Sequence, residues 1–440
     1  MNNRIFISVA AYKDPELVNT LRDCVNNAKH PENLRFSVCW QFDERDSFNE
    51  EFRNSLKNKE FGKITVLEVP YHKSKGTCWA RSQIQQQYNG EGYSLQLDSH
   101  HRFVKDWDVK CIGIVKKLQK KGFKKPLLTA YVPEYDPDND PAGRAKEPWQ
   151  LSFDRFIPEG AVFFLPCSIH DHKSRTTPVR ARFFSAHFVF TLGKWVEEVP
   201  YDPNYFFHGE EISLAARSYT HGYDLFHPHE IICYHEYTRK NRTKYWDDHT
   251  DQLKVEKKTE KNWVERNNDC HLRNRKLFEM DGYENDIDFG PYGFGTERSL
   301  ADYEEYAGIS FSKRGVQQYT LDNKEPPNPV IEDKDEYENS FSSIFKHFVD
   351  VQKESLPDKD YDCLVVAFED KDGNEIYRQD ADENEIKNLW SKSDTDGVGH
   401  LAILRQFQTA TIPYKIIVWP HSKSKGWTDR QEHLVPHCVS

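Results

Sequence analysis

Apolar runs alternate with helix-like segments along the amino-terminal part of the chain. Four nearly continuous apolar runs are typical of strands that are covered on both faces: residues 5–11, 34–40, 64–69 and 93–98. After the first run, Leu17, Leu21 and Val25 recur at helical spacing, and Asp14-Pro15 stands where that helix would begin, with Asp14 as its cap. A further helix is expected from Gly76 to Gln87. This alternation predicts an α/β fold built on a parallel, doubly wound sheet.

The pattern changes twice further along the chain. More strands and helices are expected up to about residue 320, at residues 107–120, 127–132, 183–191, 210–220 and 300–306, with a loop at 135–148 and a charged, helix-prone stretch at 240–276. Residues 322–329 are polar and proline-rich, which is typical of a linker. Beyond it, strands are expected at residues 362–368, 375–377 and 415–419. The chain is therefore predicted to have a large domain at 1–320 and a small β-rich domain at 333–440.

Composition narrows the class of protein. The chain has 28 Phe, 22 Tyr and 10 Trp, which can form a sizeable core although only 37% of the residues are hydrophobic. A net charge of −11 argues against nucleic-acid binding and against binding to an anionic membrane, both of which need a basic face.

Cysteine usage and the absence of apolar targeting segments predict a location. The 9 Cys are scattered singly, without a CxxC pair, as expected for reduced thiols. No signal peptide is visible, and no apolar run approaches the ~20 residues of a membrane helix. We therefore expect a cytoplasmic protein without an integral membrane segment.

Asp98-Ser99-His100 is the most informative stretch. It directly follows the apolar run Tyr93–Leu97. A carboxylate and an imidazole two residues apart, just past the carboxyl end of a strand, can hold one divalent cation in the crevice where such sheets bind ligands. Asp43 follows another strand and is expected at the same edge. The alternative is an ordinary surface turn, since Asp-Ser is common turn chemistry.

A second polar stretch, Phe207-His208-Gly209-Glu210-Glu211, opens a predicted helix. Gly209 would allow a ligand to approach the backbone closely. Glu210 and Glu211 could bind sugar hydroxyls, because a carboxylate accepts several hydrogen bonds. They could equally be helix-terminal charges that the helix dipole favours.

A third stretch places histidines around a short apolar strand. His227, His229 and His235 all flank it, and any of them could supply a further metal ligand. A lone histidine beside a strand can also be only a structural hydrogen-bond donor.

Several of these motifs, taken in order, resemble one family. They are residues 5–12, Gly76-Thr-Cys-Trp-Ala-Arg81, Leu97-Asp-Ser-His100, Val199-Pro-Tyr-Asp-Pro203, Phe207-His-Gly-Glu-Glu211 with Arg217, Thr220-His-Gly-Tyr-Asp224, and Gly293-Phe-Gly-Thr-Glu-Arg298 with Tyr303. They are similar to the cytosolic polypeptide N-acetylglucosaminyltransferases that modify hydroxyproline on a ubiquitin-ligase adaptor. The resemblance covers residues 4–312. The remainder of the chain lies outside it.

The resemblance implies a GT-A glycosyltransferase fold, which is Rossmann-like with a mostly parallel sheet. Members of the family use a UDP-sugar, typically UDP-N-acetylglucosamine (UDP-GlcNAc), with Mn²⁺ or Mg²⁺, and they retain the anomeric configuration. The metal-binding DXD-type motif falls on Asp98-Ser99-His100. A more distant likeness to polypeptide N-acetylgalactosaminyltransferases implies His235 as the third metal ligand.

The resemblance also suggests roles for the other site residues. The expected donor-binding residues are Ala10, Tyr12, Asp43, Arg81, Asp98 and Ser99. Within that set, Asp43 would accept a hydrogen bond from uracil, and Arg81 would add a fixed positive charge near the phosphates or uridine. Glu210 and Glu211 are the candidate catalytic or sugar-holding carboxylates.

We therefore expect a metal-dependent retaining transferase that moves N-acetylglucosamine (GlcNAc) from UDP to a hydroxyl of a protein or glycan acceptor. One rival is a transferase that builds a polysaccharide from another UDP-sugar. The other is a sugar-binding protein without turnover, in which the carboxyl-terminal domain is the lectin-like part. That domain could bind the acceptor, pair two chains into a homodimer, or only stabilise the protein.

Overall fold

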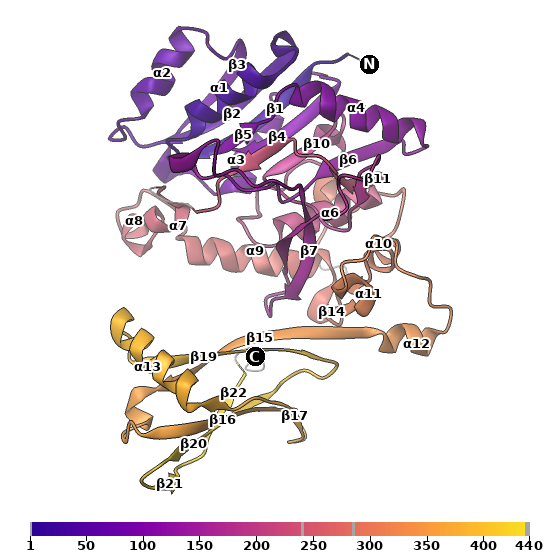
Figure 1. Cartoon of the computed structure of the whole chain (residues 1–440). Coiled ribbons are helices and arrows are strands. Elements are labelled where there is room, and N and C mark those ends of the chain that lie inside the picture. The colour runs from indigo at the N-terminus through magenta and orange to yellow at the C-terminus, as the bar shows by residue number, and fades with distance from the viewer. Residues whose placement is uncertain (1, 239–241, 284–286, 436–440) are drawn as a thin grey trace. The chain divides into compact units, whose positions relative to one another are not determined.

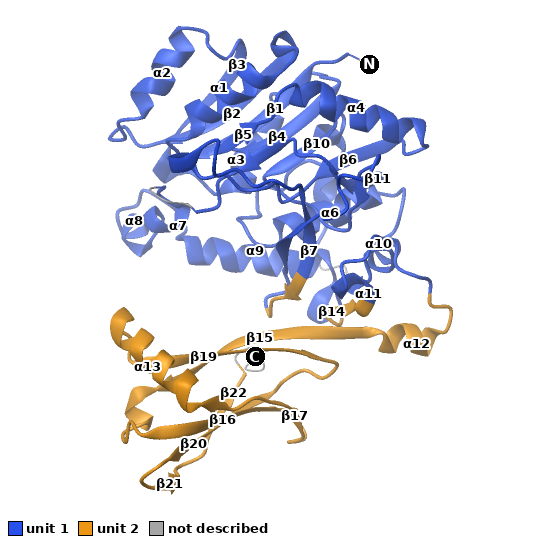
Figure 2. Ribbon diagram, in the orientation of Figure 1, with its two compact units in different colours: residues 1–153, 159–312, 319–330 blue, residues 154–158, 313–318, 331–440 orange. Residues whose placement is uncertain are grey.

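The structure is a computed structural model, and it describes residues 2–238, 242–283 and 287–435. The chain divides into two compact units (Figures 1 and 2). Unit 1 consists of residues 1–153, 159–312 and 319–330, and unit 2 of residues 154–158, 313–318 and 331–440. Each unit is described below on its own.

An eight-stranded sheet organises unit 1, in the order β3-β2-β1-β4-β10-β6-β11-β9. The strands are β1 (Ile5–Tyr12), β2 (Leu34–Phe42), β3 (Lys63–Pro70), β4 (Tyr93–Asp98), β6 (Lys125–Thr129), β9 (Val179–Arg180), β10 (Phe188–Leu192) and β11 (Tyr223–His227). The pairs β3–β2, β2–β1, β1–β4 and β6–β11 are parallel, whereas β10 and β9 run antiparallel to their neighbours. The expected α/β class with a mostly parallel sheet is confirmed.

Helices and short strand pairs complete unit 1. The helices are α1 (Leu17–Asn27), α2 (Asn49–Lys57), α3 (Thr77–Gln85), α4 (Trp107–Lys120), α5 (Trp195–Glu198), α6 (Glu210–Thr220), α7 (Tyr245–Asp248), α8 (Asp251–Val255), α9 (Trp263–Leu277), α10 (Leu300–Ala307) and α11 (Gln318–Leu321). The remaining strands are β5 (His101–Phe103), which pairs with β12 (Cys233–His235), β7 (Trp149–Phe156), which pairs with β8 (Val162–Ser168), and β13 (Ile309–Ser310).

The apolar runs form strands because both of their faces are covered. Ile5, Ile7 and Val9 of β1 join one core cluster with apolar side chains of α1, α2 and α4. On the alternate face, Phe6 contacts Tyr88, which follows α3. Because both faces of the strand are buried, its sequence is continuously apolar and does not alternate between apolar and polar residues.

Unit 2 is a two-layer β structure with one helix packed against its core. Its elements are β14 (Gly315–Gln317), α12 (Lys334–Asn339), β15 (Phe341–Gln352), β16 (Tyr361–Glu369), β17 (Glu375–Arg378), β18 (Ala381–Asp382), α13 (Glu383–Asp396), β19 (His400–Thr409), β20 (Lys415–Ser422), β21 (Gly426–Trp427) and β22 (Gln431–Leu434). β15 pairs with β19, and β16 pairs with β20, β17 and β18. Inward side chains of both pairs and Ile386 of α13 share one core.

Some of the predicted elements begin and end at the residues observed in the structure, and others have different bounds. The helices expected at residues 107–120 and 210–220 are confirmed as α4 and α6. The strand expected at 183–191 is shorter, because only Phe188–Leu192 inserts between β4 and β6. Residues 240 and 241 of the charged helix-prone stretch lie outside the described residues. No helix in the described parts of the chain is long and apolar enough to cross a membrane.

Two local predictions were wrong. Asp14 does not cap α1: the residue before the helix is Glu16, and one oxygen of Asp14 accepts the Glu16 N–H at 2.9 Å. Residues 322–329 are not a free linker, because residues 319–330 belong to unit 1. There, Asn328 is buried and accepts a hydrogen bond from Arg182.

Candidate functional site

Strand register brings three predicted ligands together at the carboxyl edge of the central sheet. Asp98 is the last residue of β4 and lies opposite Ala10 of β1. The chain then turns into β5, which pairs antiparallel with β12 so that His101 faces His235. This long-range pairing places His235 beside His100, although 135 positions of sequence separate them.

Asp98, His100 and His235 form a compact set of possible metal ligands. Asp98 Oδ2 lies 3.8 Å from His100 Nε2 and 3.5 Å from His235 Nε2. One ligand atom from each of the three lies within 4.8 Å of the others. A carboxylate with two imidazoles is a ligand set suited to a divalent transition metal.

Asp14 fixes the orientation of His100 from behind. Its Oδ2 lies 2.7 Å from His100 Nδ1 and accepts a hydrogen bond from Ser99 Oγ at 2.6 Å. Burial opposes ionisation of Asp14, but His100 and Arg242 more than offset it and lower the Asp14 pKa. In the tautomer whose Nδ1–H donates to Asp14, His100 presents the Nε2 lone pair to the centre of the cluster.

Arg242 joins the same network. Its Nη1 lies 3.4 Å from Asp14 Oδ2 and also contacts His100 Nδ1, and its Nη2 lies 2.6 Å from Glu236 Oε2. Arg242 therefore links Glu236, just after β12, to the Asp14–His100 pair.

His235 has the properties of a metal-binding histidine. It is buried, and neither ring nitrogen has a hydrogen-bond partner within the described part of the chain. Burial lowers the His235 pKa well below its ordinary value, so the ring is neutral, the form that binds metals. Buried polar atoms are normally satisfied, so these orphaned nitrogens fit a divalent cation held between them and Asp98.

Two further histidines enclose this group. His187 stacks on His235 with ring centroids 4.3 Å apart, and its Nε2 accepts the Val132 N–H at 3.2 Å. His101 lies 4.9 Å from His235, centroid to centroid. Burial lowers the pKa of both rings. His187 was missed in the sequence, where its only signal is a histidine inside the apolar run 183–191.

Arg81 connects the metal-ligand cluster to the start of α6. Its guanidinium is buried and donates to Asp98 Oδ1 at 2.6 Å, and it also pairs with Glu210. Burial alone would raise the Asp98 pKa, but His235 and Arg81 hold it well below its usual range. Arg81 therefore meets Asp98 and Glu210 directly, which keeps both carboxylates at fixed positions.

The two carboxylates at the start of α6 have different surroundings. Gly209 precedes them at φ +87°, a conformation that suits glycine. Glu210 pairs with Arg81, whereas Glu211 accepts hydrogen bonds from the Ala186 N–H at 2.9 Å and Tyr131 Oη at 3.0 Å. Burial raises the Glu211 pKa to about 7. The pair therefore combines a carboxylate that is bound by Arg81 with one that titrates near neutral pH.

The predicted nucleotide-binding residues lie at the ends of β1 and β2. Asp43 borders a hollow of about 520 Å³ that is also lined by Tyr71 and Asp248. Hydrogen bonds from Arg45 lower the Asp43 pKa to about 2. Tyr12 donates to Asp248 Oδ2 at 2.8 Å. The hollow is therefore rich in fixed hydrogen-bonding groups.

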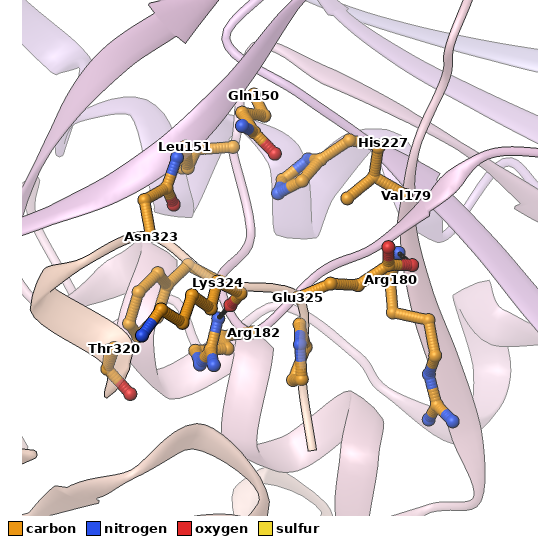
Figure 3. Close-up of a pocket in the computed structure, with 12 residues that line it drawn as sticks. Gln150, Leu151, Val179, Arg180, Arg182, His227, Thr320, Asn323, Lys324 and Glu325 are labelled. Carbon is orange, nitrogen blue, oxygen red and sulfur yellow. Dashed lines mark hydrogen bonds between the residues drawn. The ribbon is translucent and has the colours of Figure 1, made fainter. Parts of the chain in front are cut away.

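Of the candidate site residues considered in the sequence, only His227 lines a second hollow of unit 1 (Figure 3). Arg182 and His227 line it, but Arg182 donates to the carbonyl of Lys324 and to Asn328, and His227 Nδ1 lies 2.7 Å from the Thr129 carbonyl. Its volume is about 10 Å³, room for roughly one water molecule. We assign it no substrate.

The thiols match the predicted redox state. The eight described cysteines are free, and six of them are buried. The ninth, Cys438, lies outside the described residues.

Solved structures that the chain resembles include several glycosyltransferases. GalNAc-T7 with UDP, GalNAc and Mn²⁺ is 13% identical, with a TM-score of 0.43 over 69% of this chain and 54% of that one, so the chain spans about half of its length. S. aureus TarS 1–349 in complex with UDP-GlcNAc is 10% identical, with a TM-score of 0.37 over 62% and 73% of the two chains. The mannosyltransferase PcManGT from Pyrobaculum calidifontis, with GDP-Man and Mn²⁺, is 10% identical, with a TM-score of 0.35 over 54% and 58%. No curated protein sequence matches the chain.

A family model matches most of the chain. The model of the family described as glycosyltransferase (GlcNAc) matches residues 4–61 and 49–313. That range contains the central sheet and all of the predicted site residues. The chain therefore belongs to the glycosyltransferase (GlcNAc) family, and its mostly parallel α/β sheet is that of the expected GT-A fold.

Proposed function

We propose that the protein is a metal-dependent retaining glycosyltransferase that moves GlcNAc from UDP-GlcNAc to a hydroxyl of a protein or glycan acceptor. The observation that carries the proposal is the cluster of Asp98, His100 and His235 at the carboxyl edge of the sheet. Family membership supports a GlcNAc donor. The resemblance of the sequence motifs to the transferases that modify hydroxyproline supports a protein hydroxyl as the acceptor.

The three ligand atoms would be Asp98 Oδ2, His100 Nε2 and His235 Nε2. A bound Mn²⁺ or Mg²⁺ would supply positive charge to the diphosphate leaving group. Two imidazoles favour Mn²⁺, because Mg²⁺ prefers oxygen ligands. Asp14 would accept a hydrogen bond from His100 Nδ1, which is the tautomer that such a site needs.

The other donor-binding groups would surround this cluster. Asp43 would accept a hydrogen bond from uracil in the hollow beside Tyr71, and Tyr12 would hold Asp248, which lines the same hollow, in place. Ala10, opposite Asp98, and Ser99, bonded to Asp14, would border the sugar phosphate.

Glu210 and Glu211 would hold the sugar or the acceptor. Glu210 is held in place by its pairing with Arg81, so it suits hydroxyl binding. Glu211, with a pKa of about 7, could hold a proton at Oε2, where Tyr131 also bonds. We name neither as the nucleophile, because retention can proceed on the front face, with the leaving phosphate oxygen taking the acceptor proton.

The proposal extends to location and assembly. Free, mostly buried thiols support a reducing compartment such as the cytoplasm. A role for unit 2 as an accessory domain, and a homodimer formed through it, remain predictions.

UDP release from UDP-GlcNAc, measured with and without Mn²⁺, tests the proposal. Asp98→Ala should abolish metal-dependent release, whereas Glu197→Ala, an exposed position on α5, should leave it unchanged. Circular dichroism should show that both variants fold. Release by Asp98→Ala at the parent rate would contradict the metal assignment.

A donor screen separates the alternatives. Faster release from another UDP-sugar would favour the polysaccharide-building transferase. Binding of UDP-GlcNAc with no release under any metal would favour the sugar-binding protein without turnover.

A further inference from the structure

The outer face of the β16–β20 layer in unit 2 carries two exposed tryptophans. Along β20, Ile416 and Val418 point into the core, so Trp419 and His421 point outward. Trp427 of β21 lies directly opposite His421 in the ladder. Trp419 is 37% exposed and Trp427 50% exposed. We call Trp419, His421 and Trp427 the aromatic platform; β20 and β21 are labelled in Figure 1.

The rings of the platform are held in place. The two indole centroids lie 4.6 Å apart, and the Trp427 and His421 centroids lie 4.8 Å apart. Trp419 Nε1 donates to the Thr428 carbonyl at 2.8 Å, which fixes the ring by its edge. The platform therefore presents rigid ring faces at little cost in side-chain entropy.

A bulge supplies a polar group next to the rings. The β16–β20 register shifts between Tyr361 and Cys363, and the extra residue is Asp362. Its Oδ1 lies 2.6 Å from His421 Nδ1, with both side chains about one-third exposed. β-bulges commonly re-aim a side chain in this way. A fixed acid–imidazole pair thus borders the platform.

The size of the platform argues against a protein partner. Another exposed apolar pair of unit 2, Phe348 and Leu404, lies on the outer side of the β15–β19 layer. The two pairs therefore belong to opposite layers and do not form one patch. Stable protein interfaces bury about 800 Å² on each partner, more than two half-exposed indoles offer.

We propose that the aromatic platform is a carbohydrate-binding site for a chain of gluco-configured pyranoses. In such sugars all hydroxyls are equatorial, so both ring faces are C–H surfaces that can stack on indoles. Asp362 and His421 would bind the hydroxyls at the rim. This site is separate from the proposed donor site, and it would hold a glycan acceptor or product.

Binding of N,N′,N″-triacetylchitotriose to the full chain, without metal or UDP, tests this by calorimetry. Trp427→Ala should weaken binding at least tenfold, and Trp427→Phe should restore most of it. Phe348→Ala removes a similarly exposed ring on the other layer and should bind like the parent. A β-linked galactose oligomer, whose axial hydroxyl interrupts one ring face, should bind more weakly than the chitotriose.

Asp98→Ala separates this inference from the proposed function, and it should bind the chitotriose as the parent does. The inference is overturned if the parent does not bind, if Trp427→Ala binds equally well while folded, or if binding is lost in Asp98→Ala. It is also overturned if sedimentation shows that Trp427→Ala converts a dimer to a monomer in a chain that binds no glycan, because a second copy would then cover the platform.

Discussion

The geometry of the candidate metal ligands depends on one carboxylate, that of Asp14. Oδ2 of this residue meets Ser99, His100 and Arg242. We predict that Asp14→Asn weakens Mn²⁺ binding by about 10- to 100-fold, as is usual when the hydrogen-bond partner of a metal-bound histidine is changed. Titration of Mn²⁺ in the presence of UDP would measure it. Glu44→Gln, at an exposed position, is the control; equal affinities in all three proteins would contradict the role of Asp14.

Glu211 should make stability depend on pH. Burial raises its pKa to about 7 in the folded chain, above the ordinary value of 4.5, so the folded state binds the proton more tightly. Proton binding by Glu211 therefore adds to the free energy of unfolding. This stabilisation is fully present below about pH 4.5 and is lost as the pH rises to about 7. Glu211→Gln has no carboxyl group to titrate, so its stability should not fall over this pH range. At pH 8 its free energy of unfolding should exceed that of the parent by at most about 3 kcal/mol.

Urea unfolding at pH 5 and pH 8 checks this prediction. Glu197→Gln, which changes an exposed carboxylate on α5, should follow the parent at both values. A pH dependence in Glu211→Gln equal to that of the parent would show that another group is responsible.

The sequence indicates only those site residues whose neighbours are close along the chain. Asp98 and His100 are two residues apart after a strand, so their joint role could be predicted. His235 was one of three open choices until the family resemblance favoured it. Asp14 was expected as a helix cap, and Arg242 was not expected at all, because their contacts with His100 arise from pairing over 86 and 142 positions.

The start of α6 depends on a backbone conformation that only glycine adopts easily. At Gly209, φ is +87°, and an added Cβ would lie 2.8 Å from Asn274 Oδ1. Asn274 is buried and donates to the Gly160 carbonyl, so it cannot move aside freely. We predict that Gly209→Ala lowers the free energy of unfolding by about 2 kcal/mol, from backbone strain and the displaced side chain.

At another glycine, Gly113, substitution by alanine is expected to stabilise the protein. Gly113 lies inside α4, and nothing lies within 4 Å of an added Cβ. Gly113→Ala should stabilise the protein by up to about 1 kcal/mol, through helix propensity. Urea unfolding of both variants measures the contrast, and equal effects would contradict the interpretation of Gly209.

Elements were predictable where burial or periodicity was strong. β1, β2 and α4 stand out because an apolar run or a helical stripe marks each of them. The antiparallel direction of β10 was not visible, since direction is set by the neighbours of a strand. β15 and α13 were missed, because β15 mixes polar and aromatic side chains and α13 follows an acidic stretch.

At the scale of the whole molecule, the predicted boundary of the second domain can be tested by cutting the chain. Every residue of the unit 2 core, from Val349 to Val435, lies within the expected domain 333–440. Unit 2 also includes residues 154–158 and 313–318, and β14 in the latter pairs with β15. The core is therefore complete without these segments, although one short strand is lost.

We predict that the fragment 333–440 folds by itself and unfolds cooperatively in urea, with a free energy of about 5 kcal/mol or more. Leu364→Ala, at a fully buried position, should cost about 2–5 kcal/mol in the fragment. The exposed Ile412→Ala should cost much less, because its side chain is 68% exposed. A fragment that unfolds without a cooperative transition would mean that the smaller segments are needed, and that the domain begins before residue 333.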